Sequence, residues 1–221
     1  METVAGSGRH LNPAHTTIIE VTNLNPDGPG SLKSALEAEM PRTVVFTVSG
    51  AIHLTEMPRI EHPYLTVAGQ TAPSPGISIH GAGIYVLTHD VLIQHLRIRA
   101  GDDPDGPPPV SRDALTIYNP SPTSSEVYNV VIDHCSLTWA IDENLNTRSE
   151  YLYGVERVTI RHCLIAEGLD SPLHPEGGHS RGFLIGKDDQ DILVYGNLFA
   201  HNANRNPVVS IRSRALIANN Y

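Results

Sequence analysis

The sequence predicts an all-β solenoid, a parallel β-helix, on two observations. One short phrase of alternating apolar and polar residues recurs: "VLIQHLRI" from Val91, "VVIDHCSL" from Val130, "VTIRHCLI" from Val158, "ILVYGNLF" from Ile192 and "ALIANNY" from Ala215. The intervals between the phrases vary, which is typical of coils of constant cross-section whose surplus residues leave as loops. The period of 3.6 of a helical repeat and the Asn-Gly hairpin signals of a sandwich are both absent from these phrases.

Within each phrase, alternate residues are expected to point to the same side of a strand. The predicted inward pairs are Val91/Ile93, Val130/Ile132, Val158/Ile160, Ile192/Val194 and Ala215/Ile217. A turn position follows each strand, at Leu96, Cys135, Cys163, Asn197 and Asn220. In a parallel β-helix, equivalent positions stack at about 4.8 Å as side-chain ladders.

One short helix is predicted before the repeats, at about residues 31–40. In "GPGSLKSALEAEM" Ser31 is a suitable N-cap, Leu32, Ala35 and Leu36 share one face, and Pro41 follows the end. Strands are expected next in "RTVVFTVSG" and "LTVAG". The helix would cap the N-terminal end of the solenoid.

Length and composition limit the other possibilities. A chain of 221 residues with 40% hydrophobic content supports one core, so residues 1–221 are expected to form a single domain. The net charge of -9 argues against a nucleic-acid partner. No apolar run approaches the roughly 18 residues of a membrane helix, and no signal peptide is visible in "METVAGSGRH". The compartment stays open.

Part of the histidine and cysteine content is explained by the repeats. Ile132, His134 and Cys135 recur one coil later as Ile160, His162 and Cys163. Recurrence predicts that the two histidines stack and form hydrogen bonds instead of binding a metal, and that the cysteines form a ladder instead of a redox centre. Two buried thiols and one bridge both remain open.

The segment "WAIDENLNT" has no counterpart in the other coils, so packing alone does not require it. If Asp142, Asn144 and Asn146 alternate along an extended segment, their oxygens could share a hard cation such as Ca²⁺. By the same alternation Glu143 would point away. A solvated acidic turn is the alternative.

A family resemblance emerges from several motifs in order. "VVIDHCSL", "DENLNT", "FLIG", "NRNPVV" and "LIANNY" resemble the pectate lyase family of pectate/pectin lyase-like polysaccharide lyases, and "VTNLNPDGPGSLKSAL" resembles that family's first strand and capping helix. The resemblance implies a right-handed parallel β-helix. It also implies a secreted enzyme that cleaves α-1,4-polygalacturonate, an acidic polysaccharide, by Ca²⁺-dependent β-elimination.

The resemblance assigns a metal site and a base. Asp113 in "RDALTI" and Asp142 in "DENLNT" match calcium aspartates, and Asn146 stands where the family often has a further Asp. Asn146 keeps an oxygen but lacks the charge, which should weaken calcium binding. Arg205 in "NRNPVV" matches the catalytic arginine. Because arginine normally keeps its proton, this role predicts an alkaline optimum.

The resemblance also suggests substrate-binding cations. Arg181 stands where the family tends to place a lysine, and Lys187 lies just beyond it. Ser210 occupies a position where a second arginine is frequent, and Arg212 could replace it. Arg181 and Arg212 could equally be plain surface cations.

The family generally continues with further coils where this chain ends, so its C-terminal coils are expected to be short or missing. The last coil would then be covered by self-association, or the chain would be a shortened form of lower stability. Three functions remain open: a Ca²⁺-dependent pectate lyase, a lyase for pectin or another uronate polysaccharide, and a non-catalytic, carbohydrate-binding β-helix.

Overall fold

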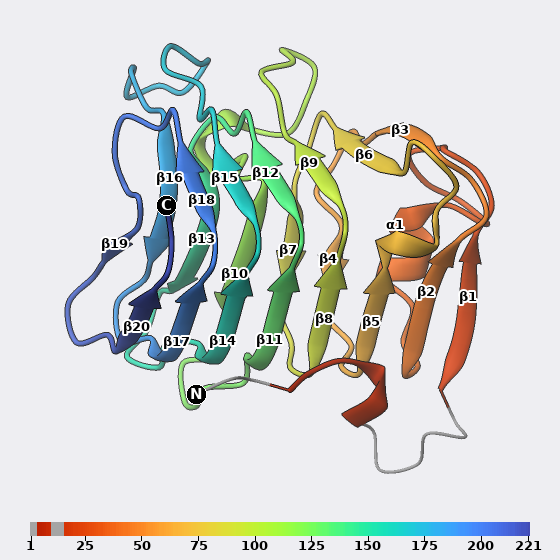
Figure 1. Ribbon diagram of the computed structural model, residues 1–221, viewed down its shortest axis with the longest axis horizontal. Helices are drawn as coiled ribbons and strands as arrows, with labels where there is room; N and C mark the ends of the chain where they lie inside the picture. Colours follow the sequence, from red (N-terminus) through yellow and green to blue (C-terminus); the bar gives the residue numbers. More distant parts are fainter. Residues whose placement is uncertain (1–3, 10–15) are drawn as a thin grey trace.

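Three parallel β-sheets run side by side along one solenoid (Figure 1). The computed structural model describes residues 4–9 and 16–221. Each full coil contributes one strand to each sheet in turn, and neighbouring strands within a sheet are parallel. The predicted fold class, a right-handed parallel β-helix, is confirmed.

The sheets are named here A, B and C in the order in which the chain visits them. Sheet A contains β1 (Thr17–Val21), β2 (Arg42–Phe46), β5 (Leu65–Ala68), β8 (Val91–Gln94), β11 (Tyr128–Asp133), β14 (Glu156–Arg161), β17 (Gln190–Tyr195) and β20 (Ala215–Ala218). Sheet B contains β3 (Gly50–His53), β6 (Ile77–His80), β9 (Arg97–Arg99), β12 (Ser136–Thr138), β15 (Leu164–Ala166) and β18 (Leu198–Ala200). Sheet C contains β4 (Arg59–Ile60), β7 (Ile84–Val86), β10 (Leu115–Asn119), β13 (Glu143–Ser149), β16 (Arg181–Ile185) and β19 (Val208–Val209).

The core consists of ladders of aliphatic side chains inside the coils. Ile132 pairs with Ile93 on one side and with Ile160 on the other, and Val194 and Ile217 continue this row. The row that begins with Val91 has the same register. The predicted inward pairs are therefore confirmed, because each apolar position of one phrase lies on the same position of the next.

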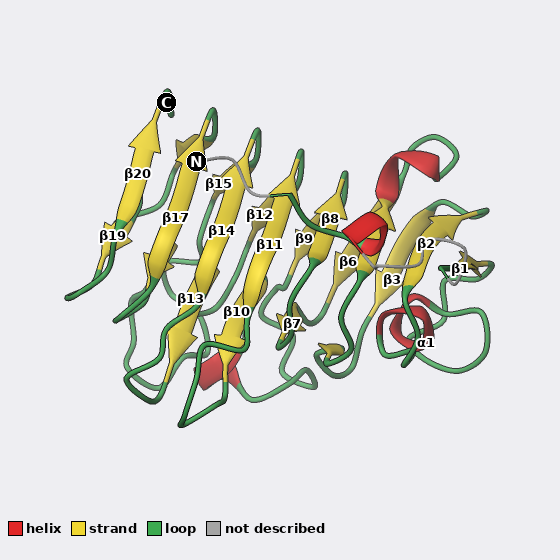
Figure 2. Ribbon diagram, turned by 90° about the horizontal axis from the view of Figure 1, so that it is seen from below, coloured by secondary structure: helices red, strands yellow, loops and turns green. Residues whose placement is uncertain are grey.

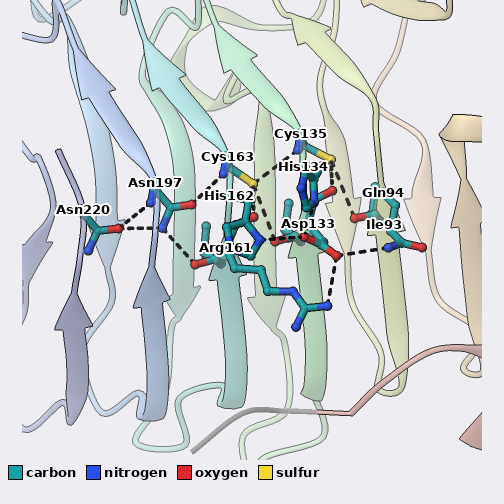
Figure 3. A network of polar contacts seen from close by, with 12 residues as sticks. Ile93, Gln94, Asp133, His134, Cys135, Arg161, His162, Cys163, Asn197 and Asn220 are labelled. Carbon is teal, nitrogen blue, oxygen red and sulfur yellow. Dashed lines mark hydrogen bonds and ion pairs between the residues drawn. The ribbon is translucent and has the colours of Figure 1, made fainter.

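A second ladder occupies the turn between sheets A and B (Figure 3). Asn220 Oδ1 accepts from Asn197 N at 2.9 Å, Asn197 Oδ1 accepts from Cys163 N at 2.9 Å, and Cys163 Sγ accepts from Cys135 N at 3.4 Å. Both cysteines are free and buried, so two thiols, and no bridge, are present. The residue before each ladder position has a positive φ, for example 54° at His134, which turns the chain sharply.

The histidines of this turn lie ring beside ring, but the predicted stacking of His134 on His162 is only partial, because their ring planes are tilted by 44°. The ring centroids of His134 and His162 lie 4.8 Å apart, and those of His95 and His134 lie 4.9 Å apart. His134 Nδ1 lies 2.6 Å from Asp133 Oδ1 (Figure 3). The carboxylate of Asp133 also accepts from Arg161 at 3.0 Å, and it is therefore well satisfied.

The predicted helix is present but shorter than expected. Helix α1 spans Leu32–Leu36, with Ser31 as its N-cap, and lies next to β1 at the end of the solenoid (Figure 2). The prediction of residues 31–40 was wrong at the C-terminal end. The buried Arg42 guanidinium explains the early end, because it donates to the carbonyl oxygens of Ala35 and Leu36 that another helical turn would use.

Helix α1 is the single α-helix of the described residues, and among their helices none is long and apolar enough to cross a membrane. Two long loops, residues 100–114 and 167–180, leave the solenoid between sheets B and C and project from the same edge (Figure 1). They touch where Leu173 N donates to Asp102 Oδ1 at 3.1 Å. These loops flank the amino ends of the sheet C strands.

Candidate active site

Four successive coils bring charged side chains to the amino ends of the sheet C strands. Asp113 precedes β10, Asp142 and Glu143 lie at the start of β13, Arg181 begins β16, and Arg205 precedes β19. The register is direct, since Glu143 pairs with Arg181 and Arg181 forms a bridge with Asn204. Residues that are about 30 positions apart in the sequence thus become neighbours.

Asp113 is a deeply buried carboxylate of the site, with 3% of its surface exposed. Its oxygens accept from the Thr116 hydroxyl at 2.6 Å, from Glu143 N at 2.9 Å and from Asn146 Nδ2 at 3.3 Å. Burial raises the pKa of Asp113 to about 7, and the charge of Asp142 acts in the same direction. Three hydrogen bonds thus hold the carboxylate in place.

Glu143 points into the site, contrary to the sequence expectation. It is 2% exposed and forms an ion pair with Arg205 Nη1, while Arg181 Nη1 lies 3.5 Å from Glu143 Oε1. Glu143 and Arg181 are each the first residue of a strand, where strict alternation does not yet fix a long side chain. Glu143 thus joins the predicted site residues.

The donor set fits a hard cation. Carboxylate oxygens of Asp113, Asp142 and Glu143 lie within 4.8 Å of one another. Beside them Asn146 Oδ1 is buried and has no hydrogen-bond partner, which is costly for an amide oxygen. Such a group of oxygens is what Ca²⁺ requires. Asn144 does not contribute, because its Oδ1 accepts from Ala140 N at 3.1 Å and its side chain holds the adjoining turn.

Arg205 is held in an unusual backbone conformation, with φ of 59°. Its carbonyl oxygen accepts from Phe183 N at 2.6 Å, and a Cβ at position 182 would overlap that oxygen, so Gly182 permits the close approach. Burial lowers the pKa of the Arg205 guanidinium, whereas the carboxylates of Asp142 and Asp113 oppose this shift. The ion pair with Glu143 also favours the protonated form.

The three predicted substrate-binding cations lie in two different places. Arg181 is in the site, with Nη1 2.6 Å from Asp142 Oδ1. Lys187 and Arg212 lie instead beyond the other end of β16, where both approach Asp188, at 4.0 Å and 2.5 Å. Six residues separate Arg181 from Lys187, or about 20 Å of extended chain. The structure therefore does not bring Lys187 and Arg212 to the carboxylates.

Two histidines of the 167–180 loop, which the sequence analysis did not single out, also reach the site. The side chains of His174 and His179 are 5% and 0% exposed, and both face Asp142. The loop has no counterpart in the other coils, so no repeat pattern marks them. The segment "LHPEGGHS" offered only the signal of two histidines close in sequence.

The comparisons with known proteins agree with this architecture. No family profile matches the chain. A protein of Aspergillus flavus named "Probable pectate lyase C" is 33% identical over 190 residues, which is 86% of this chain and 39% of that protein. The protein of the same name from Aspergillus terreus is 33% identical over 193 residues, 87% of this chain and 40% of that protein. The chain thus spans about two fifths of the length of these relatives.

The fold has a solved counterpart as well. The crystal structure of jun a 1, the major allergen from cedar pollen, superposes with a TM-score of 0.66 at 19% identity, covering 98% of this chain and 63% of that one. Fold and site together define a parallel β-helix with a carboxylate and arginine cluster at the edge of one sheet. The chain is a homologue of the fungal proteins named probable pectate lyase C, and the resemblance to the pectate lyase family is confirmed.

Proposed function

We propose that this chain carries the active site of a polysaccharide lyase that cleaves polygalacturonate by Ca²⁺-dependent β-elimination. The observation that carries the proposal is the meeting of Arg205 with Asp113, Asp142 and Glu143 at one point, from three of four successive coils. A packing role alone does not require this concentration of charge. The names of the relatives support the same substrate class.

The reaction breaks the C5–H and C4–O bonds of a uronate and forms a C4–C5 double bond. The C5 proton passes to the base, and the C4 oxygen leaves with the neighbouring sugar and takes up a proton from water. Asp113, Asp142, Glu143 and the Asn146 amide oxygen would hold the ion. Bound Ca²⁺ would neutralise the substrate carboxylate and make the C5 proton more acidic. The residues of the chain then have to take the proton, stabilise the developing charge and position the sugar.

Arg205 is the proposed base. It must be neutral to accept the C5 proton, and the burial that lowers its pKa favours this state. Its ion pair with Glu143 favours the protonated state instead, so this ion pair has to open before Arg205 can act. The neutral fraction of an arginine grows with pH, and an alkaline optimum is expected.

Arg181 is the proposed contact for the substrate carboxylate. Its side chain is 19% exposed and binds Asp142 in this structure. To contact the substrate carboxylate, Arg181 would have to leave Asp142. A guanidinium near the reacting carbon adds fixed positive charge where the enolate develops. Lys187 and Arg212 could contact only a long substrate that also crosses the far end of β16. Because such a polymer is met outside the cell, we infer an extracellular site of action.

The test is the ultraviolet absorbance of the unsaturated product from polygalacturonate at alkaline pH. We expect a Ca²⁺-dependent rise that a chelator abolishes and that Arg205→Ala reduces by at least about 100-fold. Arg214→Ala is the matched control, since Arg214 also forms an ion pair on the last coil, with Asp191 at 2.7 Å.

Two results would change the assignment. Activity that survives the chelator would favour a lyase for pectin or another uronate, without calcium. A folded chain that binds oligogalacturonate and yields no product would favour the non-catalytic, carbohydrate-binding β-helix.

A further inference from the structure

We propose that Asp142, His174 and His179 form a second metal site, selective for a divalent transition-metal ion such as Zn²⁺. One ligand atom from each of the three residues lies within 4.8 Å of the others. The site lies under the 167–180 loop, beside the all-oxygen cluster and sharing Asp142 with it. Its binding chemistry does not depend on the proposed lyase function.

His179 supplies the strongest observation. Its Nδ1 lies 2.6 Å from Gly177 O, so this nitrogen carries the proton and donates to the carbonyl. The lone pair is then on Nε2, which is buried and has no hydrogen-bond partner. A backbone carbonyl on one nitrogen is a common way in which proteins fix the tautomer of a histidine that binds metal through the other.

The orphaned nitrogen faces a carboxylate. His179 Nε2 lies 3.4 Å from Asp142 Oδ1, close enough for an ion pair but without hydrogen-bond geometry. Arg181 Nη1 already donates to this oxygen at 2.6 Å, whereas the buried Nε2 of His179 has no donor of its own. The ring of His174 lies next to that of His179, with the centroids 3.7 Å apart. A metal ion between the two rings would satisfy the buried Nε2 of His179 and join both histidines to Asp142.

The spacing suits one small ion. Two ligands at about 2.0–2.1 Å from tetrahedral Zn²⁺ lie roughly 3.3 Å apart. His179 Nε2 and Asp142 Oδ1 are already at 3.4 Å, and His174 Nε2 lies 4.0 Å from Asp142 Oδ2, so a small movement of His174 completes the set. His174 Nδ1 would have to give up the bond that it accepts from Glu176 N at 3.2 Å. Glu176 Oε2, 3.9 Å from His179 Nε2, can turn to become a fourth ligand.

The ligand types separate the two sites. Imidazole nitrogens favour zinc and its neighbours, whereas Ca²⁺ takes oxygen ligands. Another cluster of the described residues, Asp133, His134 and His162, has a similar composition. There, however, the two histidines are half-exposed, and Asp133 accepts from both Arg161 at 3.0 Å and Gln94 at 3.1 Å, whereas Asp142 accepts from Arg181 alone and faces two buried histidines. That cluster serves as the matched control.

An ion at this site would join the 167–180 loop to β13 and would occupy Asp142. Zn²⁺ should then compete with Ca²⁺ for that carboxylate, a consequence that rests on the proposed function. The binding site itself is tested without substrate, so failure of the zinc site and failure of the lyase proposal remain distinguishable.

The experiment is calorimetric titration of the chelator-treated chain with Zn²⁺, with the visible spectrum of bound Co²⁺ as a second readout. We expect one ion per chain, binding at least tenfold weaker to His174→Gln and to His179→Gln, and unchanged in the double variant His134→Gln/His162→Gln. Circular dichroism identifies any variant that fails to fold. Of the two single variants, His174→Gln should disturb the fold less, because His174 is the less buried histidine.

The spectrum of bound Co²⁺ should be that of a four-coordinate site. Absence of binding, binding retained by either folded single variant, or binding lost only in the double control variant would overturn the proposal.

Discussion

Each charged side chain that this fold buries has several partners of its own. Arg42 donates to main-chain carbonyl oxygens, including that of Met40 at 3.1 Å and that of His62 at 3.2 Å, and burial still lowers its pKa to about 10. Asp189 accepts from Thr147 Oγ1 at 2.6 Å and from Val155 N at 2.9 Å. Hydrogen-bond partners offset part of the hydration that a buried charge loses, but not all of it. The uncompensated part shifts the pKa of the buried group, and the stability of the fold therefore depends on pH.

Asp189 allows this dependence to be predicted. Burial raises its pKa from 3.8 to about 6, so the folded chain keeps a proton that the unfolded chain has released. The contribution of Asp189 to the free energy of unfolding therefore falls as the pH rises from about 4 to about 6, by at most about 3 kcal/mol, and is constant above. When urea unfolding is measured across this pH range, the free energy of unfolding of Asp189→Asn should therefore fall less than that of the parent chain.

Asp191→Asn is the control for that measurement. Asp191 lies two residues away but is half-exposed and forms a surface ion pair with Arg214. It should leave the pH dependence of the parent chain unchanged. Equal slopes for Asp189→Asn and the parent chain would contradict the assigned shift.

At the scale of single elements, the turn ladder joins neighbouring coils more specifically than the apolar core does. Asn197 is 2% exposed, accepts from Cys163 N at 2.9 Å, and donates to Ile160 O at 2.9 Å. Aliphatic rows tolerate exchange of similar side chains, whereas an amide in a turn satisfies main-chain groups that water does not reach. One side chain thereby fixes two adjacent coils.

Replacement of Asn197 should therefore be costly. Asn197→Ala leaves Cys163 N and Ile160 O without their partners, and we expect the free energy of unfolding to fall by about 2–4 kcal/mol. Asn25→Ala, at an exposed position near the N-terminus, should change it by less than about 0.5 kcal/mol. Urea titration measures both, and a similar small effect of the two substitutions would mean that water takes over the role of the Asn197 amide.

The same distinction explains what the sequence could predict. Ile132 and Cys135 recur in the next coil as Ile160 and Cys163, and repetition reveals a ladder without any coordinates. The end of α1 depends on Arg42, a long-range contact that helix propensities do not contain. His179 lies in a loop that occurs once in the chain, so no repeat pattern could predict its approach to Asp142.

The candidate site was predictable to a similar extent. Asp113, Asp142 and Arg205 came from ordered motifs that resemble a family, and the structure brings them together. Glu143 was expected to point away, because alternation was applied to the first residue of a strand. Arg212 was expected near the base, but its position follows the turn at Asp188 instead. Sequence spacing does not tell which end of a strand a neighbouring cation will occupy.

At the scale of the whole molecule, the solenoid buries each coil against its two neighbours, and the final coil of the described structure has a neighbour on one side only. Strand β20 pairs with β17, and its other edge is open. Leu216 and Ile217 on β20 are 55% and 42% exposed. An open strand edge with apolar side chains favours pairing with another chain.

We expect the 221-residue chain to associate through this edge. Sedimentation velocity should show a mass that rises with concentration, and Ile217→Lys should shift the equilibrium toward the monomer. Ile18→Lys, on β1 at the opposite end of the same sheet, is the matched control because Ile18 is 68% exposed. Dissociation by Ile18→Lys and not by Ile217→Lys would assign the contact to the other end.

The two buried cysteines of the turn ladder can report on local opening of the solenoid. Both are 3% exposed, so an alkylating reagent reaches neither thiol while the coils are closed, and burial also raises the pKa of Cys163 well above its ordinary value. Modification must wait until β11 and β14 separate. The rate at which the native chain consumes a thiol reagent therefore reports how often the middle of the solenoid opens, independently of the fraying of its ends.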